Sequence, residues 1–234
     1  MGAGYGGVRA FTATSGPGLS LMAESISMAA VAEIPVVIID VMRAGPSTGM
    51  ATKVEQSDIR YAVGSGHGDA EKIVLAAASI KDCYYIVQEA FNLAEEYQTP
   101  VIVLSDLQFG MCKQSVPAFD RNRIGIRRGK LVTEGLSELD MKTKSYFHRF
   151  EDTEDGISPR TIPGVKNGMF LSTGLEHNAL NPAEKFWGVF WRRRDIPFSA
   201  SACLHPGSKA DIRRLPCVSR PRKLRRSESM WIVL

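Results

Sequence analysis

The sequence predicts an α/β fold, a parallel sheet flanked by helices. Two continuous runs of β-branched and aliphatic residues, 36–39 and 101–104, are typical of strands buried on both faces. Between them, Ser79 begins a capping box, and apolar residues then recur at helical spacing until the Thr-Pro pair at 99–100 ends the helix. Because parallel strands need crossovers of about a dozen residues or more, these runs indicate right-handed β-α-β units.

Weaker signals predict two further strands and one more helix. Residues 8–14 form a short β-favouring run that a Gly-Pro-Gly turn breaks, and residues 73–77 form a second short run. Residues 19–32 are rich in Leu, Met and Ala and apolar nearly all round, which predicts a single buried helix.

The composition excludes several classes of protein. The chain has 234 residues, of which 44% are apolar and 23% charged, so it can bury a core and is not disordered throughout. No run approaches the roughly 18 apolar residues of a membrane span, and the Gly-rich start lacks the pattern of a secretory signal. The four cysteines are scattered without a Cys-x-x-Cys pair, so we expect no metal site built from this chain's thiols. Scattered free cysteines fit a reducing, cytoplasmic compartment.

The last quarter of the chain differs from the rest in charge. Residues 178–234 carry 12 Lys and Arg against 4 Asp and Glu, whereas residues 1–177 carry 17 against 21, and all three Trp lie in the later segment. One interpretation is an arm that binds nucleic-acid phosphates through its arginines. The other, which we favour, is an irregular tail, because five prolines interrupt it and it shows no helical or strand period.

Two loops follow predicted strands, where ligands bind in parallel sheets. The first is the turn Ser15-Gly16-Pro17-Gly18, and the second is the long segment 42–68, far longer than a usual connection of about 2–6 residues. Arg43 is placed to hold a carboxylate or phosphate through its bidentate fork, or alternatively to staple the loop. His67 is either a catalytic candidate or an ordinary loop histidine. Although Gly2, Gly4 and Gly7 spell a dinucleotide fingerprint, no strand precedes them, so we reject that interpretation.

Five stretches in one order carry a resemblance to a known family. They resemble the alpha subunit of 2-oxoacid:ferredoxin oxidoreductases, and they are residues 8–18, 43–49 with Thr52-Lys53, 66–68, 98–106 and 154–160. The specific acid (2-oxoglutarate, pyruvate or a branched-chain oxoacid) stays open, and the motif sequences look closest to those of the 2-oxoglutarate type.

The resemblance implies an activity and a set of partners. This family oxidatively decarboxylates a 2-oxoacid, transfers the acyl group to coenzyme A and passes electrons to ferredoxin. Its alpha segment is a pyrimidine-side, thiamine diphosphate-binding α/β domain, while a beta subunit holds Mg²⁺ and an iron–sulfur cluster. By resemblance, Arg43 would bind the substrate carboxylate, Thr52 would line the substrate pocket, and Ser15, Gly16, Pro17 and Gly18 would lie near the pyrimidine.

The departures from the family also make predictions. Family alpha segments begin earlier, with a Tyr-Pro-Ile-Thr-Pro motif and a glutamate that hydrogen-bonds the pyrimidine, so the resemblance predicts an incomplete domain that is inactive in isolation. Met42 stands where the family often has Gln, and Ala44 where it often has Gly.

The resemblance also suggests a division of the chain. Residues 1–110 would be the partial thiamine diphosphate domain, 111–177 a linker or extension, and 178–234 a basic tail that is no folded domain. Because the resemblance stops near His177, we hypothesise that the tail is translated out of frame or is divergent. A non-catalytic scaffold of the same complex is the alternative function.

Overall fold

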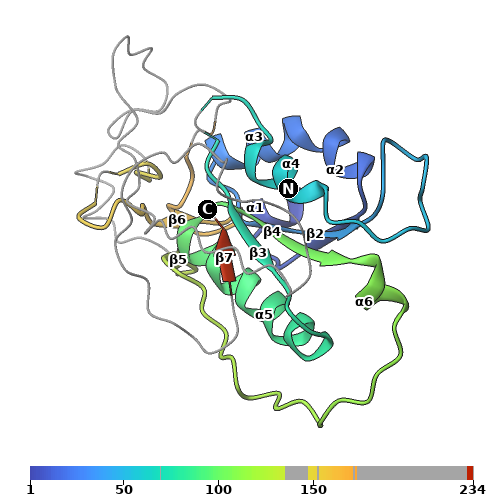
Figure 1. Cartoon of the computed structure of the whole chain (residues 1–234). Helices are drawn as coiled ribbons and strands as arrows, with labels where there is room; N and C mark the ends of the chain where they lie inside the picture. Colours follow the sequence, from blue (N-terminus) through green and yellow to red (C-terminus); the bar gives the residue numbers. More distant parts are fainter. Residues whose placement is uncertain (69, 135–146, 152, 171, 173–230, 234) are drawn as a thin grey trace.

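The computed structural model describes residues 1–68, 70–134, 147–151, 153–170, 172 and 231–233 (Figure 1). Its main sheet has the order β1-β2-β4-β3-β7. The strands are β1 (Phe11–Thr14), β2 (Val36–Met42), β3 (Ile73–Ala76), β4 (Pro100–Asp106) and β7 (Trp231–Val233). Strands β1 to β4 pair in parallel, and β7 pairs antiparallel to β3. The predicted parallel α/β sheet is confirmed.

Helices cover both faces of this sheet (Figure 1). Helices α2 (Pro17–Leu21), α3 (Ala23–Val31) and α4 (Asp58–Gly64) lie on one face, and α5 (Ile80–Tyr97) lies on the other. Helix α1 (Gly2–Tyr5) precedes β1, and α6 (Leu107–Met111) follows β4. Among the described residues, no helix is both long and apolar enough to cross a membrane.

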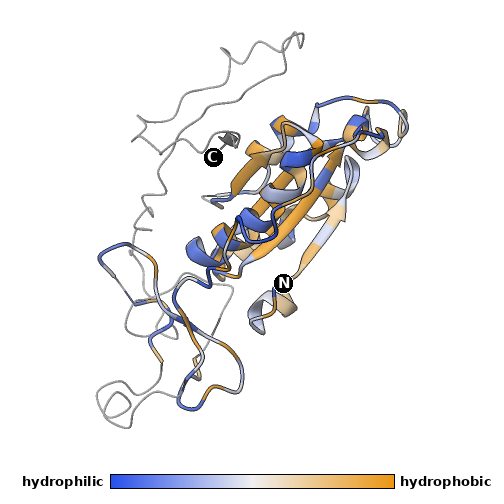
Figure 2. Ribbon diagram, turned by 90° about the horizontal axis from the view of Figure 1, so that it is seen from below, coloured by the Kyte–Doolittle hydropathy of each residue, from blue (hydrophilic) through white to orange (hydrophobic). Residues whose placement is uncertain are grey.

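Successive strand residues point to opposite faces and build two core layers. Ile38, Ile102 and Leu104 pack with Leu19, Ile26 and Ala62 of the helices on the α2–α4 face. On the α5 face, the buried residues are Val37, Ile73, Leu75, Val101, Val103, Ile86, Ala90 and Ala94. Figure 2 shows the same arrangement as an apolar sheet between more polar helices.

Two predictions about the helices were wrong. Residues 19–32 are not one helix, because Met22 adopts φ −95° and ψ −2° and its N–H donates to Leu19 O, which separates α2 from α3. The segment 42–68 is not loop throughout, because α4 lies within it. Its residues Ile59, Ala62 and Val63 do have helical spacing.

Helix α5 matches its prediction closely. Ser79 is its N-cap, and the Ser79 Oγ accepts a hydrogen bond of 3.1 Å from the backbone N–H of Asp82. The helix ends at Gln98, which has a left-handed conformation directly before Thr99 and Pro100.

The chain after α6 packs against α5. The Asp120 backbone N–H donates to the Tyr85 hydroxyl at 2.9 Å, and Asn92 Nδ2 donates to Gly125 O at 2.8 Å. A small two-stranded parallel sheet follows, formed by β5 (Leu131–Val132) and β6 (Arg160–Thr161). The division of the chain at residue 110 stays a prediction.

The tail lies almost wholly outside the described residues. This includes the arginines of the nucleic-acid interpretation, Arg192, Arg193, Arg194, Arg220, Arg222, Arg225 and Arg226. The exception is β7, a short strand that the aperiodic sequence did not predict.

Candidate functional site

Four strand residues stand side by side near the carboxyl ends of the parallel strands. Thr14 of β1 pairs with Asp40 of β2, Asp40 with Leu104 of β4, and Leu104 with Ala76 of β3. The β1–α2 turn and the loop after Met42 both start just beyond this row. The register therefore brings the two sequence-predicted loops to one edge of the sheet.

The β1–α2 turn requires glycine at two positions. Gly16 has φ +55° and ψ −114°, a backbone conformation that residues other than glycine rarely adopt. A Cβ on Gly18 would collide with the Thr14 hydroxyl. Pro17 is the first residue of α2, where its missing N–H costs nothing, and Gly18 N donates to Ser15 O at 3.3 Å.

Arg43 lies across this turn. A Cβ built on Gly16 would be 3.5 Å from Arg43 Nε and 3.7 Å from its Cγ. The Nε atom is buried and has no hydrogen-bond partner among the described residues. The side chain of Arg43 thus lies against the Gly16 turn, and its buried Nε–H group has no hydrogen-bond acceptor among the described residues.

The loop after Arg43 folds back on itself and carries Thr52. The Ala44 N–H donates to Lys53 O at 2.8 Å. This hydrogen bond brings the exposed Thr52, the residue before Lys53, back near Arg43, the residue before Ala44. Further along, Gln56 Nε2 donates to Asp106 Oδ2 at 3.0 Å, which ties this loop to the end of β4.

His67 lies apart from these residues. It is exposed and follows α4 on the connection that enters β3 at Ile73. Because α4 runs from the carboxyl end of β2 to the amino end of β3, His67 sits toward the opposite edge of the sheet from Arg43. The structure does not bring the two side chains together.

Sequence reasoning missed two acidic residues under Arg43. Asp40 of β2 is fully buried, and its carboxyl lies within hydrogen-bonding reach of the Asp58 carboxyl at the start of α4. Burial first, and then the Asp58 charge, raise the pKa of Asp40 to about 7. Burial also raises the pKa of Asp58, opposed by the backbone N–H groups of Arg43 and Gly16. An acid inside a β-branched run was the signal available in the sequence.

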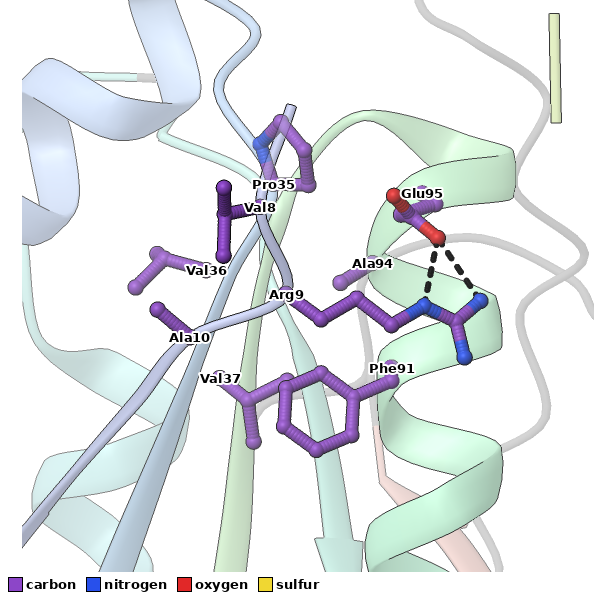
Figure 3. Close-up of a pocket in the computed structure, with 9 residues that line it drawn as sticks. All are labelled: Val8, Arg9, Ala10, Pro35, Val36, Val37, Phe91, Ala94 and Glu95. Atoms are coloured by element: carbon purple, nitrogen blue, oxygen red, sulfur yellow. Dashed lines mark hydrogen bonds and ion pairs between the residues drawn. The ribbon is translucent and has the colours of Figure 1, made fainter. Parts of the chain in front are cut away.

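Two hollows in the described part of the chain lie at the other edge. One is lined by residues that precede or begin β1 and β2, together with Phe91, Ala94 and Glu95 of α5 (Figure 3). Arg9 crosses this hollow, donating to Glu95 Oε2 at 2.7 Å, and its guanidinium lies 5.9 Å from the centre of the Phe91 ring. The second is lined in part by Tyr5, Arg149 and Phe170. Neither contains Arg43 or Asp40.

Residues 1–183 match the protein family described as pyruvate flavodoxin/ferredoxin oxidoreductase, thiamine diP-binding. The chain belongs to this family. The chain's fold also resembles a solved structure, a 2-oxoglutarate:ferredoxin oxidoreductase from Magnetococcus marinus with 2-oxoglutarate, coenzyme A and succinyl-CoA bound. That similarity has a TM-score of 0.71 and 43% identity over 79% of this chain and 31% of the other.

Curated members of the family are similar too. Subunit alpha of 2-oxoacid:ferredoxin oxidoreductase 2 from Aeropyrum pernix is 43% identical over 91% of this chain and 34% of its own length. The 2-oxoglutarate synthase subunit KorA from Archaeoglobus fulgidus is 34% identical over 92% of this chain and 70% of its own length. The chain thus spans about a third of the length of the first of these relatives.

These two alignments bear on the tail. Because 91% and 92% of the chain exceed residues 1–177, both alignments include part of residues 178–234. This extent counts against a change of reading frame immediately after His177. The out-of-frame origin of later residues stays a prediction.

Proposed function

We propose that the chain is part of the alpha subunit of a 2-oxoacid:ferredoxin oxidoreductase, which converts a 2-oxoacid and coenzyme A to acyl-CoA and carbon dioxide and transfers the two electrons released to ferredoxin. The observation that carries this proposal is the position of Arg43. Its guanidinium crosses the β1–α2 turn at the carboxyl edge of the sheet with a buried Nε that no described residue uses. The guanidinium of an arginine at such an edge suits a carboxylate ligand.

In this role, Arg43 positions the acid. A guanidinium holds a carboxylate in a fixed plane, which aligns the neighbouring keto carbon for attack and lowers the entropic cost of the reaction. Thr52, exposed on the same loop, would contact the rest of the acid and contribute to the choice between 2-oxoglutarate, pyruvate and branched-chain oxoacids. The relative with 2-oxoglutarate bound supports the 2-oxoglutarate type. His67 has no role in this arrangement.

Thiamine diphosphate would lie beside the turn formed by Ser15, Gly16, Pro17 and Gly18. Two features fit the coenzyme: the turn has no bulky side chain at either glycine, and Arg43 lies directly against it. When bound, the coenzyme supplies the carbanion chemistry of decarboxylation. The residues of this chain bind and orient the acid next to it.

The remaining components would come from other subunits. The relatives are alpha subunits, which implies partner subunits. We propose a beta subunit that contributes Mg²⁺ and an iron–sulfur cluster, and ferredoxin as the acceptor that docks through it. The free Cys83 and Cys112 fit a cytoplasmic enzyme.

The test is an Arg43→Ala change in the full chain assembled with its partner subunits. Loss of charge-assisted hydrogen bonds worth about 1.5–3 kcal/mol should lower kcat/KM for the 2-oxoacid about 10- to 150-fold. Arg43→Lys keeps the charge but not the planar fork, so its kcat/KM should lie between the values of the unaltered complex and of Arg43→Ala. Arg60→Ala, which removes an exposed arginine of α4, is the matched control and should leave both parameters unchanged.

The alternatives give different results. If the chain is only an assembly scaffold, Arg43→Ala will leave kcat and KM untouched while the complex still forms. If the basic tail makes it a nucleic-acid-binding protein, the full chain will bind duplex DNA with a steep salt dependence. No described residue favours that second alternative.

A further inference from the structure

The carboxyls of Asp40 and Asp58 lie within hydrogen-bonding reach of each other in a largely buried site. Both oxygens of Asp40 and Oδ2 of Asp58 are buried without a hydrogen-bond partner among the described residues. The Gly16 N–H approaches both carboxyls and the Arg43 N–H approaches Asp58, closely enough to lower the pKa of each, but neither group donates a hydrogen bond to an Asp40 oxygen or to Asp58 Oδ2. Buried polar atoms without partners are costly and need an explanation.

A single proton provides that explanation. If one carboxyl is protonated, its O–H donates to the other carboxylate, and the contact becomes a short charge-assisted hydrogen bond. Two ionised carboxylates at this separation would instead repel each other in a site from which water is excluded. The proton comes from solvent, and the pair keeps one negative charge.

The surrounding groups set the electrostatics of the pair. Asp40 is flanked in the sheet by Thr14 and Leu104, which are uncharged. The charged groups that face the pair are Arg43, beyond the end of β2, and Glu55, in the loop before α4. With one proton, the pair's charge is balanced by Arg43, and Glu55 is exposed to solvent.

We infer that Asp40 and Asp58 share one proton, and that the singly charged pair is a positioning device for Arg43. The pair connects three elements that meet at Arg43: β2, the start of α4 and the β1–α2 turn. It attracts the guanidinium with one charge and leaves it able to bind an anionic ligand. This inference rests on the proposed role of Arg43 as the residue that binds the substrate carboxylate.

Loss of the shared proton has a defined consequence. The second negative charge strengthens the attraction of the pair for Arg43 and competes with the substrate carboxylate. The KM for the 2-oxoacid should therefore rise as pH increases through the titration of the pair, while kcat at saturating acid changes less.

The first measurement detects the proton without any need for activity. Infrared difference spectra of the full chain, recorded between about pH 5 and about pH 9, should show a protonated carboxyl that titrates near neutral pH. Asp40→Asn should remove that band, and Asp58→Asn should shift its titration to lower pH, because the Asp58 charge is one of the causes that raise the pKa of Asp40. Glu24→Gln, at an exposed carboxyl of α3, should retain it. If no carboxyl titrates near neutral pH in the unaltered chain, the shared proton is disproved.

The second measurement tests positioning in the assembled complex. The unaltered complex should show a several-fold rise in the KM for the 2-oxoacid across that pH range. In Asp40→Asn the rise should disappear, because this variant lacks the carboxyl that titrates near neutral pH. An unchanged pH profile in Asp40→Asn would overturn the positioning role. If Arg43→Ala leaves KM unchanged while the infrared band is present, the proposed function fails and the proton pair stands.

Discussion

Glu95 of α5 and Arg160 of β6 form an ion pair of 3.1 Å in which each side chain is only 4% exposed. The same carboxylate pairs with Arg9 at 2.7 Å and with Arg128 at 2.9 Å. Glu95 therefore attaches three segments to the carboxyl-terminal half of α5: the residues before β1, the segment after α6, and strand β6. This cluster lies at the edge of the sheet opposite Arg43 and has a structural role.

We expect Glu95→Gln to destabilise the full chain by about 3–5 kcal/mol, because it leaves the buried Arg160 without a counter-charge. Urea unfolding of the full chain measures the difference. Glu89→Gln is the control, since Glu89 pairs with Arg127, which is 42% exposed, and such pairs contribute about 0–1 kcal/mol. Equal effects of the two changes would contradict a central role for Glu95.

The strands β2 and β4 and the helix α5 could be predicted because their signals are local. A continuous β-branched run, a capping serine and a Thr-Pro stop each act within a few residues of the chain. Helix α4 was missed because its 7 residues lie in a Gly-rich segment where loop signals dominate. Strand β7 was missed because its partner, β3, lies more than 150 residues earlier.

The candidate site was predictable in part for the same reason. Arg43 and the Gly16 turn follow strands, so their meeting at one sheet edge follows from parallel topology. Asp58 has no local signal of this kind. Its relation to Asp40 exists only once α4 packs on β2, as Ala62 does against the sheet core. The same packing carries the chain from one edge to the other and separates His67 from Arg43.

We expect Gly16→Ala to raise the KM for the 2-oxoacid and to destabilise the chain by about 1–3 kcal/mol. The backbone of Gly16 lies in a region that is nearly restricted to glycine, and relief of that strain would shift the turn against which Arg43 packs. The measurements are steady-state kinetics of the complex and urea unfolding of the chain. Gly64→Ala is the control, because a Cβ there meets nothing within 4 Å and φ is not positive. Identical KM values for the two variants would show that the turn does not position Arg43.

The buried acid should also make stability depend on pH. The pKa of Asp40 rises from 3.8 to about 7 on folding, so the folded state holds this proton more tightly than the unfolded chain does. Stability from this group is fully present below about pH 4 and is lost as the pH rises to about 7. Compared with Asp40→Asn, the unaltered chain should lose a few kcal/mol across that window. Urea unfolding at a series of pH values provides the measurement, and parallel curves for the two proteins would refute the shift.

Asn92 should hold the segment after α6 more firmly than the exposed ion pairs do. This fully buried side chain donates to Gly125 O and accepts hydrogen bonds from Arg127 N at 3.0 Å and from Arg9 Nη2 at 2.9 Å. Asn92→Ala strands these groups, at a cost of about 1–3 kcal/mol, so the backbone amide at 127 should exchange hydrogen much faster. In Arg127→Ala the same amide still donates to Asn92 and should stay protected, although the pairs with Glu89 and Glu96 are gone. Faster exchange in Arg127→Ala than in Asn92→Ala would show that the charges, and not the buried amide, attach this segment to α5.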